Sequence, residues 1–180
     1  SGAMSAVLGM DAAVIEDVLN GREGVSIANY NCPGQIVITG EAAAVAEAGT
    51  ALKEAGARRV LPLKVSGPFH SPMMRPAGEE LAKVFAGVSM NPLKVPYVAN
   101  INAEVITDCG RIEGLLVDQV SGSVRWQQSV ETMIREGVDT FVEIGPGKTL
   151  TGFLRKIDKN VKAYHIGSWE EAVQVCEELK

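Results

Sequence analysis

The two histidines of the chain, His70 and His165, are the side chains best suited to proton transfer near neutral pH. His70 lies in a segment bracketed by Gly67, Pro68 and Pro72, which is stiff enough to aim a side chain in one direction. This segment also separates two parts of the chain with different patterns, and ligand sites favour such junctions. His70 is therefore a candidate general base. His165, near the end of a predicted strand, is expected to be structural.

Residues 141–149 imitate a phosphate-binding loop, because a predicted strand is followed by a glycine turn, Lys148, Thr149 and a predicted helix. The phosphate-binding motif requires a glycine five positions before the Gly of Gly-Lys-Thr, and Val142 stands there. A tight turn between strand and helix is therefore expected. A helix N-terminus beside Lys148 could still attract an anion without being a nucleotide site.

Polar residues also gather near the predicted strands of the first third of the chain. Asn29, Asn31 and Gln35 crowd a predicted turn, where Asn and Gln are ordinary residues. Arg58 and Arg59 precede a predicted strand, and one of the two is expected to be a solvated edge charge.

The composition excludes several functional classes. Apolar residues make up 46% of the chain and charged residues 22%, which is typical of a folded globular protein. A net charge of −5 without basic runs argues against nucleic acid and a polybasic membrane patch as partners. No apolar stretch approaches the ~18 residues of a membrane-spanning helix, and the N-terminus lacks the basic region of a signal peptide. Cys32, Cys109 and Cys176 suit neither a disulfide framework nor a zinc site, so reduced thiols, a cytoplasmic location and no metal are expected.

Residues 1–65 alternate between strand and helix patterns. Helices are predicted from Asp11 to Gly21 and over residues 41–55, and strands over residues 3–9, 25–30, 36–39 and 59–65. The resulting order, β-α-β-β-α-β, predicts a ferredoxin-like unit in which two helices cover one face of an antiparallel sheet.

From residue 66 the pattern changes to longer helices and fewer strands. The predicted helices span residues 74–88, 111–120, 126–136, 150–157 and 169–179, and the predicted strands span residues 95–100, 141–144 and 163–166. Strands that alternate with helices indicate a parallel α/β layer. Three strands are few, since sheets average ~5. Residues 66–180 are therefore expected to form half of a sheet, and the domains are predicted to be 1–65 and 66–180.

Four segments carry a resemblance when they are considered together. They are residues 29–40 (NYNCPGQIVITG), 61–74 (LPLKVSGPFHSPMM), 124–126 (VRW) and 143–150 (EIGPGKTL). In this order and at these spacings they resemble successive motifs of the bacterial malonyl-CoA:acyl carrier protein transacylases and of the related acyltransferase domains of fatty acid and polyketide synthases. The resemblance covers essentially the whole chain.

The resemblance implies a large α/β-hydrolase-like subdomain into which a ferredoxin-like subdomain is inserted. Under this interpretation the chain holds the ferredoxin-like subdomain and the C-terminal half of the α/β-hydrolase-like parallel-sheet subdomain. The family's Gly-His-Ser-Leu-Gly nucleophile elbow, its Gln-Gly-Gln oxyanion segment and its malonyl-binding arginine are absent from these 180 residues. The chain is therefore expected to be inactive alone.

The resemblance also assigns roles to single residues. His70 matches the catalytic histidine that accepts the serine proton, and Gln119 matches the glutamine whose backbone carbonyl orients it. Asn31 and Gln35 fall where the acyl-pantetheine arm is expected to lie.

Two more residues complete the expected substrate site. Phe69 stands where malonyl-selective members of the family carry a bulky side chain, which would discriminate against an α-methyl branch by only ~1–3 kcal/mol. Arg59 is placed with the substrate-binding residues.

The function expected from these observations is part of an acyltransferase that moves a malonyl group from coenzyme A to the phosphopantetheine thiol of acyl carrier protein, in fatty acid biosynthesis. Malonyl-CoA and acyl carrier protein are the expected partners, and no cofactor is expected. The alternative from another class is a non-catalytic module that binds a carrier protein. A nucleotide-binding domain is disfavoured by Val142.

Overall fold

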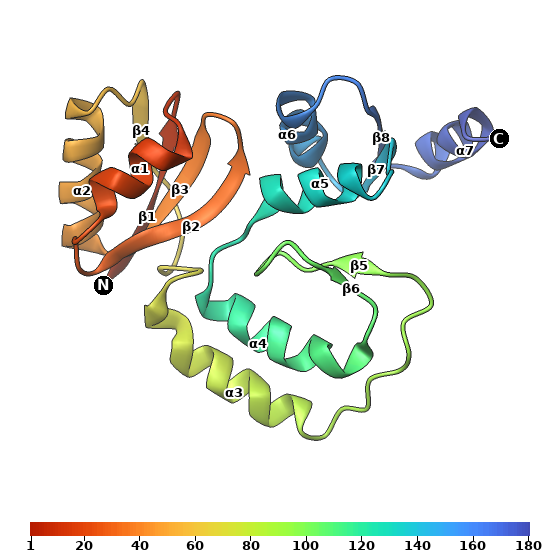
Figure 1. Cartoon of the computed structure of the whole chain (residues 1–180), viewed down its shortest axis with the longest axis horizontal. Helices are drawn as coiled ribbons and strands as arrows, with labels where there is room; N and C mark the ends of the chain where they lie inside the picture. The colour runs from red at the N-terminus through yellow and green to blue at the C-terminus, as the bar shows by residue number, and fades with distance from the viewer.

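The computed structural model describes residues 1–180 and begins with a four-stranded antiparallel sheet, drawn from red to yellow in Figure 1. Its strands lie in the order β2-β3-β1-β4, and they are β1 (Gly2–Leu8), β2 (Val25–Cys32), β3 (Gln35–Glu41) and β4 (Arg59–Pro62). Helix α1 (Ala12–Leu19) joins β1 to β2, and α2 (Ala42–Glu54) joins β3 to β4. The predicted order β-α-β-β-α-β is therefore confirmed for this part of the chain.

Alternation along the strands explains how this sheet buries its core. Val7 and Ile36 are paired across β1 and β3, and both side chains are buried on the face that α1 and α2 cover. The helices contribute residues spaced for one face, Ile15 with Leu19 in α1 and Val45 with Ala48 and Leu52 in α2. The opposite face carries a second, smaller buried cluster: Met4, Ala6, Ala28 and Val37.

The strand boundaries in this sheet differ from the predicted ones by up to three residues. The turn predicted over residues 31–35 is only Pro33-Gly34, so Asn31 belongs to β2 and Gln35 to β3. Strand β4 ends at Pro62 rather than at residue 65. Only one further sheet-like bond follows, from Leu63 N–H to the Met4 carbonyl oxygen.

The remaining elements form two groups (Figure 1). The first comprises the short 3-10 helix η1 (Pro72–Met74), α3 (Arg75–Phe85), β5 (Tyr97–Val98), β6 (Val105–Ile106), η2 (Cys109–Arg111) and α4 (Ile112–Ser121), with α3 and α4 side by side. The second comprises α5 (Trp126–Arg135), β7 (Thr140–Ile144), α6 (Thr149–Ile157), β8 (Lys162–Ile166) and α7 (Trp169–Glu178).

The parallel layer is smaller than predicted, because β7 and β8 are the only two strands that pair in parallel. The expectation that residues 95–100 supply a third parallel strand is wrong, since β5 instead pairs antiparallel with β6. Local turn chemistry explains this hairpin. Ala103 adopts a φ of 58°, its N–H binds the Ala99 carbonyl, and the Asn102 side chain accepts from Glu104 N–H. None of the helices is long and apolar enough to span a lipid bilayer.

Candidate active site

His70 lies on the loop between β4 and η1, where its backbone is left-handed with a φ of 57°. Such a conformation costs a residue with a side chain on the order of 1–3 kcal/mol and persists only where surrounding contacts impose it. Strained residues of this kind cluster at functional sites. The side chain of His70 is half-buried.

A backbone carbonyl of α4 orients the imidazole ring. His70 Nδ1 lies 3.0 Å from the carbonyl oxygen of Gln119, 49 residues further along the chain. Because a carbonyl oxygen only accepts hydrogen bonds, Nδ1 must carry the proton and donate it. Nε2 of the neutral ring then holds the lone pair that can accept a proton. The contact between His70 and the Gln119 carbonyl that the resemblance implies is therefore present.

The end of α4 explains why this carbonyl is available. The last four carbonyl groups of a helix have no partner within the helix, and Gln119 lies in this last turn. The Gln119 side chain stays at the same helix end, since its Nε2 donates to the Gly122 carbonyl at 2.9 Å and lies 3.5 Å from His70 Nδ1. Both the main chain and the side chain of Gln119 are thus engaged beside His70.

The segment after α4 is hydrogen-bonded to the four-stranded sheet. Ser123 Oγ donates to the Ile27 carbonyl at 2.6 Å. Val124 then pairs in parallel with β2, donating to the Ala28 carbonyl and accepting from Tyr30 N–H. The imidazole and its partner carbonyl therefore lie on segments that are both tied to the same small sheet.

The other predicted site residues lie apart from His70. Gln35 and Arg59 both pair with Leu8, at one end of β1. The loop of His70 lies at the other end, because the Pro68 ring packs so closely on Gly2 that a Cβ there would collide with it. Of the substrate-binding residues expected from the sequence, only Phe69 is brought next to His70, and its side chain is 39% exposed.

Asn31 follows the same pattern as Gln35 and Arg59. It lies near the end of β2, one residue before Cys32, which pairs with Gln35. The structure therefore gathers Asn31, Gln35 and Arg59 at one end of the sheet and His70, Phe69 and Gln119 beyond the other.

Sequence reasoning missed two serines that hold this region. Ser71, next to His70, is fully buried, and Ser123 makes the bond to β2 described above. A Ser-Pro pair such as Ser71-Pro72 favours the start of a turn, which was the available signal for Ser71. No sequence signal marks Ser123.

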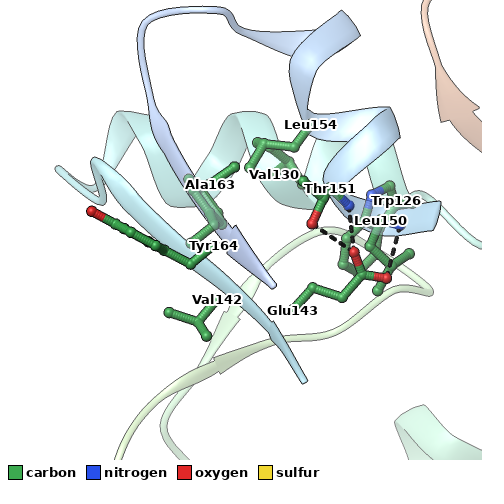
Figure 2. A pocket seen from close by; sticks show the side chains of 10 residues that line it. Trp126, Val130, Val142, Glu143, Leu150, Thr151, Leu154, Ala163 and Tyr164 are labelled. Atoms are coloured by element: carbon green, nitrogen blue, oxygen red, sulfur yellow. Dashed lines mark hydrogen bonds between the residues drawn. The ribbon is translucent and has the colours of Figure 1, made fainter. Parts of the chain in front are cut away.

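The segment that imitates a phosphate loop is closed by its own carboxylate, as Figure 2 shows. Glu143, on β7, accepts from Leu150 N–H at 3.0 Å, from Thr151 N–H at 2.7 Å and from Thr151 Oγ1 at 2.6 Å. Burial raises the pKa of Glu143, but these hydrogen bonds together outweigh it, so the pKa lies below its usual value. The expectation that this helix N-terminus could attract an anion is wrong for these N–H groups, because Glu143 already binds them.

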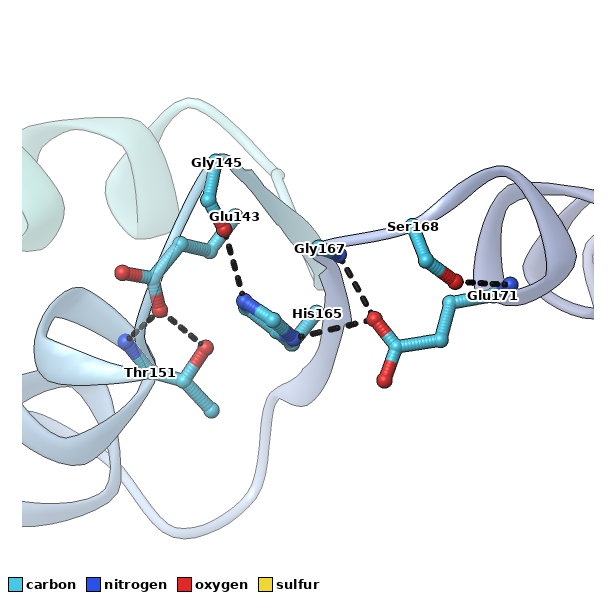
Figure 3. Close-up of polar contacts among 7 residues, drawn as sticks. All are labelled: Glu143, Gly145, Thr151, His165, Gly167, Ser168 and Glu171. Carbon is cyan, nitrogen blue, oxygen red and sulfur yellow. Dashed lines mark hydrogen bonds and ion pairs between the residues drawn. The ribbon is translucent and has the colours of Figure 1, made fainter.

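His165 links the turn after β7 to the last helix (Figure 3). Its Nε2 lies 2.9 Å from the Gly145 carbonyl oxygen, and its Nδ1 lies 3.5 Å from the Glu171 carboxylate. The same carboxylate accepts from Gly167 N–H at 2.6 Å. These contacts, with a side chain that is 10% exposed, agree with the structural role expected for His165.

A histidine that a carbonyl holds with Nε2 free, in a mixed α/β fold, is equipped for general-base chemistry of the kind that acyl transfer uses. Comparison with protein families gives the class directly. The family model described as "Acyl transferase domain" matches residues 1–175. The chain belongs to this acyl transferase family.

Within this family, the chain is similar to several individual proteins. The chain is 43% identical over 183 residues to the malonyl CoA-acyl carrier protein transacylase of Bacillus subtilis strain 168, covering 99% of this chain and 58% of that protein. Among solved structures it is similar to MCAT from Streptococcus pneumoniae, with a TM-score of 0.93 and 42% identity over 99% of this chain and 59% of that one.

A third similar structure is a type II PKS acyl-carrier protein in complex with its malonyl-transacylase, with a TM-score of 0.91 and 37% identity over 99% of this chain and 59% of that one. The chain thus spans less than two thirds of the length of the relatives that it matches.

Proposed function

We propose that the chain supplies the general base of a malonyl-CoA:acyl carrier protein transacylase, with His70 as the base and the Gln119 carbonyl as the group that orients it. The observation that carries this proposal is the 3.0 Å contact between His70 Nδ1 and the Gln119 carbonyl oxygen. The names of the relatives support the proposed substrate class. We further propose malonyl-CoA and acyl carrier protein as ligands, fatty acid synthesis as the pathway and the cytoplasm as the location.

The proposed reaction has two steps, each with one proton transfer through His70. A serine outside these 180 residues attacks the thioester carbonyl of malonyl-CoA while its proton passes to His70 Nε2. The C–S bond breaks, and the coenzyme A sulfur takes that proton, which leaves a malonyl-serine ester. The phosphopantetheine thiol of the carrier protein then gives its proton to Nε2 and attacks the ester. The C–O bond breaks, and the serine recovers its proton.

The serine is placed outside the chain because the 180 residues contain no Gly-His-Ser-Leu-Gly segment. A base without a nucleophile and oxyanion donors stabilises no tetrahedral intermediate. The chain alone is therefore expected to transfer no malonyl group.

We propose that residues 1–65 form a ferredoxin-like subdomain and that residues 66–180 belong to a larger α/β-hydrolase-like subdomain. Support for the first comes from the sheet order β2-β3-β1-β4 and from a main core confined between Val7 and Val60. Support for the second comes from the parallel pair β7–β8, because parallel sheets normally have more strands and two covered faces. Ile144 of β7 is 78% exposed.

The substrate-binding residues remain proposals of unequal support. Phe69 adjoins His70 and is partly exposed, so it is suited to contact the malonyl group. Asn31, Gln35 and Arg59 lie at the other end of the sheet, where contact with the reacting thioester is not expected. For these three we propose contacts further along the pantetheine arm.

The test uses a chimaeric chain, called here the completed chain, in which these 180 residues are joined to the part of the Bacillus subtilis relative that the match does not cover. Labelled malonyl transfer from coenzyme A to acyl carrier protein is measured for the 180 residues alone and for the completed chain. The completed chain is expected to transfer the malonyl group, and the 180-residue chain is not. Transfer by the 180 residues alone would refute the nucleophile assignment. Carrier-protein binding without transfer by the completed chain would favour the non-catalytic module.

A further inference from the structure

The hydroxyl group of Ser71 is fully buried next to His70, although Ser71 belongs to a loop. Its Oγ donates to the Pro68 carbonyl oxygen at 2.7 Å and accepts from Met73 N–H at 3.3 Å. One side-chain atom therefore joins the residues before His70 to the residues after it. The loop is closed around His70 by two bonds to a single oxygen.

The two bonds of Ser71 Oγ flank the residue with the strained backbone, His70. His70 has a φ of 57°, which an L-residue adopts at a cost unless its neighbours impose it. On one side, the Pro68 carbonyl is fixed by Ser71 Oγ, and the Pro68 ring is packed against Gly2. On the other side, Ser71 is extended, with φ of −120° and ψ of 161°, as expected before Pro72.

We propose that Ser71 is a positioning residue for His70: its hydroxyl holds the left-handed backbone that points Nδ1 at the Gln119 carbonyl. This inference rests on the proposed function only for its catalytic consequence. The rest of the proposal concerns only the direction and the tautomer of the His70 imidazole ring. Without the hydroxyl, Pro68 and Met73 lose their common partner, and the loop relaxes toward ordinary backbone angles.

A competing explanation is that Ser71 merely begins the helical segment η1–α3, since it occupies the N-cap position of η1. The chain offers a matched control. Ser129 in α5 is also buried, with 1% exposure, and its Oγ donates to the Arg125 carbonyl at 2.8 Å. Ser129→Ala also removes a buried hydroxyl group that donates to a backbone carbonyl, but no hydrogen bond joins Ser129 or Arg125 to the loop of His70.

The first measurement is made on the 180-residue chain and does not depend on activity. Two-dimensional 1H–15N NMR spectra of the histidine side chains distinguish the Nδ1–H from the Nε2–H tautomer, and Nε2–H predominates for free histidine in water. Wild-type His70 is expected as the Nδ1–H tautomer, because it donates to Gln119. Ser71→Ala is expected to shift His70 toward Nε2–H, and Ser129→Ala is expected to leave it unchanged.

The second measurement uses the completed chain. A misplacement of about 1 Å in a catalytic group costs up to ~10²-fold in rate. Ser71→Ala is therefore expected to lower kcat by about 10- to 100-fold with little change in KM, and Ser129→Ala to leave kcat unchanged. If Ser71→Ala does not fold, Ser71→Cys takes its place in both measurements, because its thiol is only somewhat larger than the hydroxyl group and is a weaker donor.

The outcomes separate the two proposals. An unchanged His70 tautomer in a folded Ser71 variant, with a melting temperature lowered only as much as by Ser129→Ala, overturns the positioning role. A shifted tautomer with full activity, in a completed chain that also tolerates His70→Ala, retains the geometric role and refutes the proposed function. A shifted tautomer with lowered kcat supports both.

Discussion

At the scale of the residue, the partner of His70 decides what this site can do. A backbone carbonyl fixes the tautomer of the ring, but it supplies no full negative charge to stabilise the imidazolium that forms on proton transfer. The imidazolium is therefore less stabilised than in a triad with a buried carboxylate. This weaker stabilisation suits the proposed reaction, in which His70 returns the same proton to a leaving thiol or serine in each step.

The first prediction concerns the base itself. His70→Ala in the completed chain is expected to lower kcat by ~10²–10⁴-fold, the usual contribution of general-base catalysis, while coenzyme A binding changes little. Malonyl transfer and coenzyme A affinity are measured together. His165→Ala is the control, since the polar contacts of His165 are with Gly145 in the turn after β7 and with Glu171 of α7. Near-wild-type turnover of His70→Ala would show that another residue is the general base.

Gln119→Ala should be much milder, because alanine keeps the carbonyl that accepts from His70. The variant loses the hydrogen bond from the Gln119 side-chain Nε2 to the Gly122 carbonyl oxygen. A neutral hydrogen bond of this kind contributes about 1 kcal/mol. A decrease in kcat of about tenfold or less is expected in the same transfer assay. A decrease as large as that of His70→Ala would assign the role to the side chain instead.

Phe69→Ser tests substrate selectivity in the completed chain. Replacing the ring by a hydroxymethyl group removes a steric penalty against an α-methyl branch, so kcat/KM for methylmalonyl-CoA relative to malonyl-CoA is expected to rise. The change should lie within ~1–3 kcal/mol of the specificity ratio. Melting curves supply the control. At 39% exposure the side chain is not a core residue, so little loss of stability is expected. An unchanged ratio of the two kcat/KM values would show that Phe69 does not determine selectivity.

At the scale of the element, Glu143 shows how a strand–turn–helix unit is stabilised from within. Its carboxylate on β7 binds two N–H groups at the start of α6, a role that Ser, Thr, Asp or Asn usually fills at the N-cap. The N-cap position itself is Lys148, which makes no side-chain bond to the helix. The strand thus provides the cap that the turn lacks.

Removing this cap should destabilise the unit. Glu143→Ala is expected to lower the free energy of unfolding by about 1 kcal/mol, the usual effect of losing a capping group. Glu143→Gln, which keeps an accepting oxygen, is the matched control and should lose less. Because folding lowers the pKa of Glu143, the ionised form contributes stability above the ordinary value of 4.5, and that contribution disappears as the pH falls through the lowered pKa. Denaturation curves between neutral and acid pH check both points, and identical acid sensitivity in wild type and Glu143→Ala would contradict them.

The elements differ in how far the sequence alone could predict them. Helices α1 and α2 and strands β1 to β3 follow from periodicity, since each buries one face against a common core. The two-residue strands β5 and β6 are too short to have a period, and turn geometry at Ala103 decides their pairing. Periodicity could not predict the contact of His70 with Gln119, because it depends on how α4 packs and on bonds between Ser123 and β2. Only the resemblance to a known family predicted the contact between His70 and the Gln119 carbonyl.

At the scale of the whole molecule, stability should be uneven. The four-stranded sheet and the chain segments packed on it bury twelve residues in one cluster, whereas no residue of β7 or β8 is buried. Amide hydrogens of β1 and β3 are therefore expected to exchange more slowly than those of β7 and β8, since local opening is easiest where little apolar surface is buried. Hydrogen-exchange mass spectrometry of the 180-residue chain measures this. Equal protection of both sheets would contradict it, and in the completed chain the protection of β7 and β8 should increase.

The packing of Gly2 against the Pro68 ring has a practical consequence for spectroscopy. The first residues are fixed to the sheet, because the Ser1 carbonyl accepts from Ala42 N–H and Gly2 pairs with Glu41. Pro68 in turn belongs to the loop that carries His70. A small fluorophore attached at position 1 would therefore lie beside this loop. Its emission would report movements of the loop when thioesters or carrier proteins are added, without any change to the residues of the site.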